Sequence, residues 1–228
     1  MKRVALTGNV ASGKSEVARV WQAAGVPVVS ADDLARKAVE PGSPALEEVV
    51  EAFGRQVLND EGGLDRDAVR RQVFSDDRAR KRLESILHPW IRRERASWEE
   101  RQREAGSPLA VSEIPLLFEV GLEDDFDTIV LVHAPESRRL SRMKENRGLD
   151  SDEARRIMDA QMDPESKRER ADHVLINDGT LQELESKARN LLETLGWTGR
   201  TAYHHDAEYR GGGREGSEGG PDEPGESR

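Results

Sequence analysis

The chain of 228 residues contains no cysteine, so disulfides and thiolate metal sites are excluded. It also lacks an apolar run near the roughly 18 residues that a transmembrane helix requires. No apolar segment follows a basic one at the N-terminus, as it would in a signal peptide. The net charge of −10 argues against a protein that coats nucleic acid. These absences predict a cytoplasmic protein that works without a membrane or nucleic-acid partner.

What is present begins with a glycine-rich loop near the N-terminus. The apolar run Val4–Leu6 predicts a buried strand, and the residues Gly8–Ser15 match the phosphate-binding loop pattern GxxxxGK[ST]. Apolar residues then recur at the spacing of one buried helix face, at Val17, Val20, Trp21 and Ala24. Strand, glycine loop and helix in this order predict a nucleotide-binding site.

The residue types in this loop suit phosphate chemistry. Consecutive backbone N–H groups form a concavity for an anion, and the start of the following helix adds partial positive charge. Gly8 and Gly13 permit close approaches and backbone angles that a Cβ would obstruct. Lys14 can reach the β- and γ-phosphates, and the hydroxyl of Ser15 can bind Mg²⁺.

Two adjacent carboxylates follow the next predicted strand, Val26–Ser30. Ligands of open α/β sheets bind beyond the carboxyl ends of the strands. Asp32 or Asp33 could therefore act as a general base or magnesium ligand, with Asp32 favoured because it lies nearer the strand end. The alternative is an N-terminal helix cap, for which aspartate is well suited.

A long helical region is predicted from residue 45 to about 104, after a Pro- and Gly-rich loop at residues 40–44. The pair His88-Pro89 predicts a break between two of its helices, with His88 packed or capping rather than contacting a ligand. Four helices without an intervening strand indicate an insertion between the second and third strands of a parallel sheet.

Three further strands are predicted at Leu109–Ile114, Thr128–Val132 and His173–Ile176. The segment after the first of these, Pro115–Glu119, is either a packed turn or part of the ligand crevice. Asn177 follows the last strand, where its amide could contact a base or simply form a turn. The final helix carries a leucine stripe that we assign to the core.

Basic residues are concentrated between residues 136 and 170, although the chain is acidic as a whole. Arg138 and Arg142 share a helix face at a spacing of four residues. A solvated helical pair is one interpretation. We favour a lid that closes its arginines over phosphates, because the chain already carries a phosphate loop.

The last 31 residues, 198–228, have a different composition, with eight glycines, seven acidic residues and four arginines. Such a segment cannot bury enough apolar surface to offset its ordering entropy, so disorder is expected. The pair His204-His205 is weak evidence for a metal site, because two adjacent histidines lack further ligands.

Strands that alternate with helices around a phosphate loop predict a P-loop kinase or NTPase with a five-stranded parallel sheet. The motif alone also occurs in other small-molecule or nucleoside kinases and in regulatory NTP-binding modules. The helical insertion and the basic lid favour an enzyme that handles a second substrate. Further motifs are more specific, and they stand at residues 6–15, 30–32, 39–42, 87–89, 114–119, 148–149 and 176–179.

In their order and spacing, these motifs resemble the dephospho-CoA kinase family from residue 1 to about 195. The resemblance implies transfer of the ATP γ-phosphate to the 3′-hydroxyl of the dephospho-CoA ribose with Mg²⁺, the final step of coenzyme A synthesis. It implies a P-loop core with a helical substrate-binding insertion and a helical lid. The corresponding segments are a nucleotide-binding core at 1–32, 108–135 and 171–197, a substrate domain at 33–107, and a lid at 136–170.

The resemblance also assigns site residues. Asp32 matches the family's catalytic aspartate, and Lys14, Arg142 and Arg147 are the other expected catalytic residues. Expected nucleotide contacts are Gly8, Ala11, Ser12, Gly13, Lys14, Ser15, Glu16 and Asn177. Expected substrate contacts are Thr7, Asp32, His88, Pro115, Leu116 and Leu117. The expected magnesium ligands are Ser15 and Asp32.

The chain departs from the family pattern in a few places. The family usually has Gly-Gly-Ile-Gly-Ser-Gly-Lys-Ser-Thr in the loop, whereas this chain has Asn9, Ala11 and Glu16. Ordinary backbone angles at Asn9 and Ala11 would make these two changes inexpensive, and the Glu16 side chain is expected to point away from the phosphates. Ser30 replaces a common aspartate. Asn146 stands where a lid arginine is expected, with Arg147 one position later.

Overall fold

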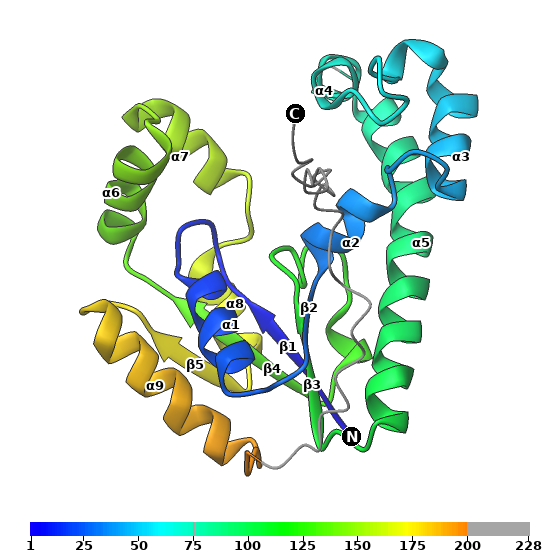
Figure 1. Ribbon diagram of the computed structural model, residues 1–228. Helices are drawn as coiled ribbons and strands as arrows, with labels where there is room; N and C mark the ends of the chain where they lie inside the picture. Colours follow the sequence, from blue (N-terminus) through cyan, green and yellow to red (C-terminus); the bar gives the residue numbers. More distant parts are fainter. Residues whose placement is uncertain (75, 200–228) are drawn as a thin grey trace, which may run out of the picture.

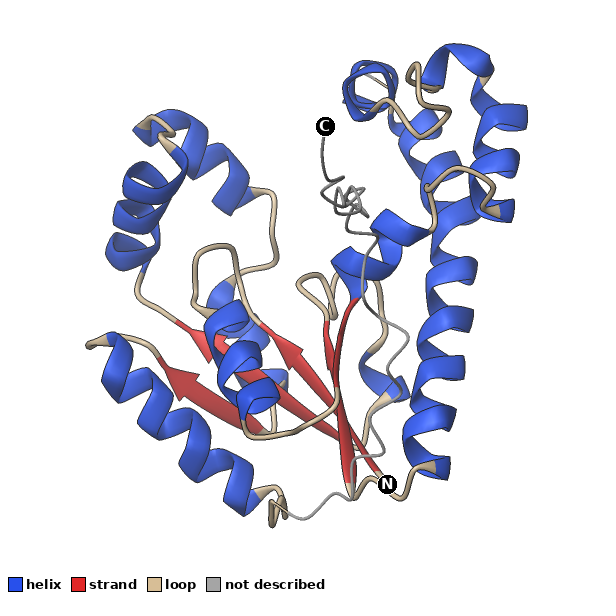
Figure 2. Ribbon diagram, in the orientation of Figure 1, coloured by secondary structure: helices blue, strands red, loops and turns tan. Residues whose placement is uncertain are grey.

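The computed structural model describes residues 1–74 and 76–199. Its centre is a five-stranded sheet in the order β2-β3-β1-β4-β5, and every strand pair in it is parallel. Figure 2 shows the strands between layers of helix. The strands are β1 (Lys2–Thr7), β2 (Val28–Ser30), β3 (Leu109–Glu113), β4 (Thr128–His133) and β5 (His173–Ile176). The α/β fold with five parallel strands, predicted from the sequence, is confirmed.

One face of the sheet is covered by α1 (Lys14–Ala23) and α9 (Leu181–Thr194). Successive side chains of a strand point to opposite faces, so Val4 and Leu6 of β1 face these helices. Trp21 of α1 is fully buried there, and its Nε1 donates to the carbonyl oxygen of Ala188 at 2.9 Å. The leucine stripe of α9 is therefore core.

The opposite face of β1 presents Ala5, which packs with Ile114, Phe118 and Ile129. Helix α8 (Pro164–Arg170) contacts β4. Leu122 and Phe126, on either side of the short 3₁₀ helix η2 (Glu123–Asp125), pack against this cluster. Because both faces are covered, the central strands consist almost entirely of buried residues.

Between β2 and β3 the chain forms a helical region with a small core of its own. Its elements are α2 (Ala31–Lys37), α3 (Pro44–Phe53), η1 (Arg55–Val57), α4 (Arg66–Phe74) and α5 (Asp77–Glu104). Val49, Val57 and Val69 are at most 5% exposed and form the centre of this core. Figure 1 shows α3–α5 standing to one side of the sheet.

The predicted helix break at His88-Pro89 is wrong, because α5 runs without interruption for 28 residues with Pro89 inside it. A proline there removes one backbone hydrogen bond. Packing anchors the helix on both sides of this position. Leu83, Ile86 and Leu87 contact the helical core, and the buried Glu99 accepts a hydrogen bond from the hydroxyl of Ser112 in β3 at 3.2 Å.

The predicted lid forms α6 (Glu136–Arg147) and α7 (Ser151–Asp159), followed by α8. Met143, Ala154 and Met158 are buried between α6 and α7, with Val10 and Ala11 of the glycine loop packed against them. In Figure 1, α6 and α7 and the helical region α3–α5 stand on opposite sides of the carboxyl edge of the sheet.

Within residues 1–74 and 76–199, no helix has the length and apolar character needed to cross a membrane. Residues 200–228 lie outside the described residues. The predictions of disorder for residues 198–228 and of a weak metal site at His204-His205 fall almost entirely on them.

Candidate active site

A cleft of about 700 Å³ opens at the carboxyl edge of the sheet. It brings together segments that are far apart in the sequence. The lining residues are Gly8–Glu16, Asp32, Pro115, Arg142, Asn146, Arg147, Gln161, Asn177, Leu181 and Leu184. They come from the glycine loop, the start of α2, the segment after β3, helix α6, the α7–α8 connection, the β5–α9 turn and the start of α9.

The glycine loop has the geometry that its sequence requires. Gly13 has φ 98°, and a Cβ there would lie 2.3 Å from Nδ2 of Asn177. A Cβ on Gly8 would lie 2.5 Å from the carbonyl oxygen of Val132. Both contacts are shorter than real Cβ contacts, so only glycine fits these two positions.

Ala11 does not have the ordinary backbone angles that would make this departure from the family pattern inexpensive. Its φ is +58°, and it is the only non-glycine residue with a positive φ in the part of the chain that the structure describes. An L-residue in this left-handed region costs about 1–2 kcal/mol, so the loop holds local strain at this position. The carbonyl oxygen of Ala11 accepts a hydrogen bond from Nη1 of Arg142 at 3.1 Å, which fixes the peptide that follows.

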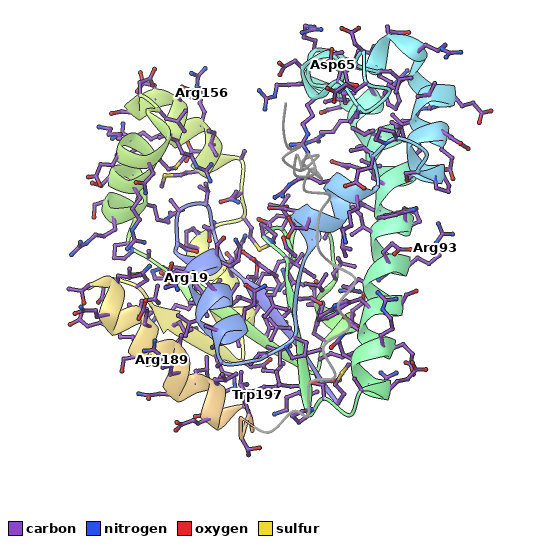
Figure 3. All side chains as sticks on the ribbon, in the orientation of Figure 1. Arg19, Asp65, Arg93, Arg156, Arg189 and Trp197 are labelled. Atoms are coloured by element: carbon purple, nitrogen blue, oxygen red, sulfur yellow. The ribbon has the colours of Figure 1, made fainter. Side chains whose placement is uncertain are left out.

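Helix α1 begins at the glycine loop without a side-chain cap. Its first backbone N–H groups are therefore not capped by a side chain, and the positive end of the helix dipole faces the cleft. Such an N-terminus is suited to bind a phosphate. Glu16 lies in this first turn, where its Oε1 accepts from Nε of Arg19 at 2.9 Å. Figure 3 shows Arg19 on α1.

A carboxylate that our sequence analysis did not identify contacts the two key residues of the loop. Oε1 of Glu113 lies 3.1 Å from Nζ of Lys14 and 3.0 Å from Oγ of Ser15. Glu113 is the last residue of β3, between Leu6 of β1 and Ser30 of β2 in the sheet register. The signal that could have revealed it is its place at the carboxyl end of a predicted strand, as for Asp32.

Asp32 and Asp33 occupy different environments. Asp32 lines the cleft, whereas Asp33 forms an ion pair with Arg36 at 2.7 Å on the outer side of α2. Neither is the helix cap that was the alternative interpretation. Ser30 is the N-cap, and its Oγ accepts from the backbone N–H of Asp33 at 3.4 Å. In the sheet register, Ser30 lies two strand spacings, about 10 Å, from Leu6, the second-last residue of β1.

Asn177, after β5, and Arg142, on α6, form hydrogen bonds to the glycine loop. Nδ2 of Asn177 donates to the carbonyl oxygen of Ser12 at 2.7 Å, and Oδ1 accepts from Nη2 of Arg142 at 3.0 Å. Asn177 is 4% exposed. Both ends of its amide thus bind protein atoms, and the side chain holds the loop in position.

The basic residues of α6 and α7 do not all lie at the cleft. Arg142, Arg147 and the intervening Asn146 line the cleft. Burial lowers the pKa of the Arg142 guanidinium, and the nearby charge of Arg138 adds to this shift. Arg156 lies instead on α7, at the end of this pair of helices far from the sheet, as Figure 3 shows. The structure therefore brings only part of the basic cluster to the phosphate loop.

Some of the expected substrate contacts lie at the cleft or are exposed, and others are buried in the core. Pro115 lines the cleft, and the next residue, Leu116, is 43% exposed. Leu117 is fully buried in the core with Phe118, and so it does not reach the cleft. Thr7 is also fully buried, and its Oγ1 donates to the carbonyl oxygen of Pro115 at 3.4 Å.

His88, another expected substrate contact, is exposed on α5 and is not among the residues that line the cleft. Its expected role as a packed or capping residue at a helix break is wrong, because α5 is continuous there.

Comparison with known proteins identifies the family of this chain. Residues 2–183 match the sequence profile of dephospho-CoA kinase. A dephospho-CoA kinase of Anaeromyxobacter dehalogenans is 45% identical over 195 residues, covering 86% of this chain and 92% of the relative. One of Corynebacterium diphtheriae is 42% identical, covering 85% and 96%.

Solved structures agree with this. A Thermus thermophilus protein of known crystal structure is 39% identical with a TM-score of 0.73, covering 85% of this chain and 97% of that one. The dephospho-CoA kinase of Campylobacter jejuni is 25% identical with a TM-score of 0.66, covering 85% and 96%. The chain belongs to the dephospho-CoA kinase family.

Proposed function

We propose that Asp32 accepts the proton of the 3′-hydroxyl of the dephospho-CoA ribose while that oxygen attacks the γ-phosphorus of ATP held by the glycine loop. The observation that carries this proposal is the cleft, which Asp32 lines together with the loop residues Gly8–Ser15. Glu16 also lines the cleft, but its carboxylate is paired with Arg19. A carboxylate within hydrogen-bond reach of an attacking hydroxyl raises its nucleophilicity as the proton leaves.

The triphosphate is held by the main chain of the glycine loop and the uncapped start of α1. Arg142 and Asn177 keep this loop in shape through the carbonyl oxygens of Ala11 and Ser12. The adenine fits beside Leu181, which is 55% exposed and lines the same cleft near Asn177. An exposed apolar side chain at this position offers a surface for a base.

Lys14 changes partners when ATP binds. In the structure its Nζ is paired with Glu113 at 3.1 Å, and both side chains are only 12% exposed. Phosphate oxygens would take over the lysine, leaving Glu113 with a negative charge beside Ser15. Lys14 then offsets charge on the transferring phosphoryl group. Arg147, which lines the lid side of the cleft, adds a second positive charge.

The oxygen atoms beside the loop fit Mg²⁺. Oγ of Ser15 and Oε1 of Glu113 lie 3.0 Å apart, and Asp32 faces the same cleft. Magnesium prefers oxygen ligands and commonly takes one or two protein ligands with phosphate oxygens and water, so a cluster of several carboxylates is not required. Ser15, Glu113 and Asp32 are the residues that would hold it. When bound, the ion supplies charge neutralisation to the β- and γ-phosphates.

Dephospho-CoA binds on the side of the helical region at residues 33–107, next to Pro115 and Leu116. The support is the arrangement in Figure 1, where this region faces the lid across the carboxyl edge of the sheet. The exposed Leu116 gives an apolar surface for the carbon chain of the substrate. The lid at residues 136–170 covers the nucleotide from the opposite side.

The test is turnover by the purified protein with dephospho-CoA and Mg-ATP. We expect ADP to form in a one-to-one ratio with a product that carries a new phosphate monoester on the ribose 3′ position, identified by mass and phosphorus NMR. ADP release that does not depend on dephospho-CoA would contradict the proposal, as would a phosphate at any other position.

A further inference from the structure

The connection between α7 and α8 is hydrogen-bonded to the glycine loop at two neighbouring residues. Oε1 of Gln161 accepts from the backbone N–H of Val10 at 2.7 Å. Nδ2 of Asn9 donates to the carbonyl oxygen of Met162 at 3.0 Å, and Asn9 is 5% exposed. The lid therefore meets the phosphate loop through residues 161 and 162 as well as through Arg142.

The contact with Val10 fixes which end of the Gln161 amide faces the loop. A backbone N–H can only donate, so the atom opposite must be the side-chain oxygen. The amide nitrogen Nε2 is then directed elsewhere, with two hydrogens to donate. Within residues 1–74 and 76–199, no hydrogen bond from Nε2 is formed. Gln161 lines the cleft together with Lys14, Asp32 and Arg142.

The backbone of this connection is anchored on its other side. The N–H of Met162 donates to Oε1 of Glu119 at 3.0 Å. The same oxygen lies 2.7 Å from Nζ of Lys167, a lysine with no exposed surface. The angles between Lys167 and Glu119 are unsuitable for a hydrogen bond, so the two side chains interact mainly by attraction between their charges. Gln161 is thus held from both sides, as a group acting on a reacting phosphate must be.

We propose that Gln161 is a further catalytic residue of this kinase, whose Nε2 donates a hydrogen bond to a terminal oxygen of the phosphoryl group being transferred. This deepens and rests on the proposed function. In the transfer, the bond from the γ-phosphorus to the bridging oxygen of ADP breaks and a bond to the 3′-oxygen forms. The proton of the hydroxyl passes to Asp32. Gln161 neither gains nor loses a proton and stabilises charge by donation alone.

A second cavity, of about 550 Å³, also borders Gln161. Its wall includes Arg139 and the carboxylates of Glu136, Asp159, Asp163 and Glu165. An Nε2 group that served these carboxylates would not contribute to phosphoryl transfer. We favour the cleft as the side to which Nε2 donates. The amide oxygen of Gln161 is bound to Val10, which precedes the strained Ala11, so the amide group lies directly beside the phosphate loop.

Two variants separate a donor from a simple latch. Gln161→Glu keeps an oxygen to accept from Val10 and removes the donor, whereas Gln161→Leu removes both. Gln22→Glu, at an exposed position on α1, is the matched control. We expect both Gln161 variants to lower kcat by about 10- to 100-fold, the range for loss of one transition-state donor. The KM for ATP should change by less than about threefold, because ground-state binding relies on the loop.

Affinity for ADP with aluminium fluoride, in the presence of dephospho-CoA, gives a second readout. It should fall with kcat in both variants, while affinity for ADP alone and the thermal midpoint stay close to those of the wild type. Full activity in Gln161→Glu together with loss in Gln161→Leu would overturn the proposal, since Gln161 would then be a latch only. Full activity in both variants would also overturn it. A wild-type protein without turnover on dephospho-CoA would instead reject the proposed function and this inference with it.

Discussion

Ala11 combines a positive φ with a place in the middle of the phosphate loop. At φ +58° its Cβ is crowded against the backbone, which costs about 1–2 kcal/mol. The surrounding contacts, including the hydrogen bond from Arg142, hold it in this conformation. Strain of this kind is found where a binding loop must be pre-formed.

Ala11→Gly should therefore raise the free energy of unfolding by about 0.5–1 kcal/mol, after the larger chain entropy of unfolded glycine is subtracted. Urea denaturation measures the change. Ala96→Gly, at an exposed position inside α5, is the control and should lose about 1 kcal/mol. A loss of stability in Ala11→Gly as large as that of the control would show that no strain is stored there.

Glu113 is the residue at which our proposal for Mg²⁺ can be tested. Its carboxylate contacts both Lys14 and Ser15 in the structure. Glu113→Gln keeps the shape and removes the charge. We expect the Mg²⁺ concentration for half-maximal rate to rise by about tenfold, within the range for groups that support a metal site. Glu48→Gln, on the exposed side of α3, is the control, and equal Mg²⁺ dependence in the two variants would exclude Glu113 from the site.

At the scale of elements, β1 is tied to the turn before β4 by Asp127. The backbone N–H of Arg3 donates to Oδ2 of Asp127 at 2.8 Å, and Nη2 of Arg3 donates to Oδ1 at 2.9 Å. These hydrogen bonds from Arg3 hold the pKa of the Asp127 carboxyl below its ordinary value of 3.8. A carboxylate whose pKa is lower in the folded state stabilises the fold above its unfolded pKa, and this contribution disappears as the pH falls through the folded pKa.

Asp127→Asn should thus lower the free energy of unfolding by about 1 kcal/mol at pH 7, because the pair is partly exposed. The difference from the wild type should persist down to about pH 4 and shrink at lower pH, where the wild-type carboxyl is protonated as well. Denaturation at a series of pH values measures this. Asp124→Asn, an exposed neighbour, should show no such trend, and a difference that is independent of pH would contradict the ion-pair account.

The continuity of helix α5 could not be predicted from the sequence. Local rules place a break at Pro89, because proline lacks the N–H that the helix needs. The helix continues because its two halves are fixed by distant partners, Leu87 against the helical core and Glu99 against Ser112 of β3. By contrast, the strand Thr128–His133 was predicted almost to the residue, since a run of buried β-branched residues marks it locally.

At the scale of the whole molecule, the cleft was predictable in outline. Parallel strands bring their carboxyl ends to one edge, so the glycine loop, Asp32 and Pro115 were expected to lie together. The pairing of individual side chains was not predictable. Glu113 and Lys14 are 99 residues apart, and Gln161 and Val10 are 151 apart, so no local pattern connects them. The family resemblance identified the motifs, whereas the contacts between their side chains came from the structure.

The central claim is that Asp32 and the phosphate loop act on two reactants in one cleft. Replacing Asp32 by Asn tests it most directly, with kcat and the dissociation constant for ATP measured in the same preparation. Asp33→Asn, whose parent side chain pairs with Arg36 outside the cleft, is the matched control. Loss of a general base predicts a fall in kcat of about 10²- to 10⁴-fold with ATP affinity changed less than threefold, and near-wild-type behaviour for the control. Equal loss of turnover and of ATP affinity in Asp32→Asn, or undiminished turnover, would contradict the account.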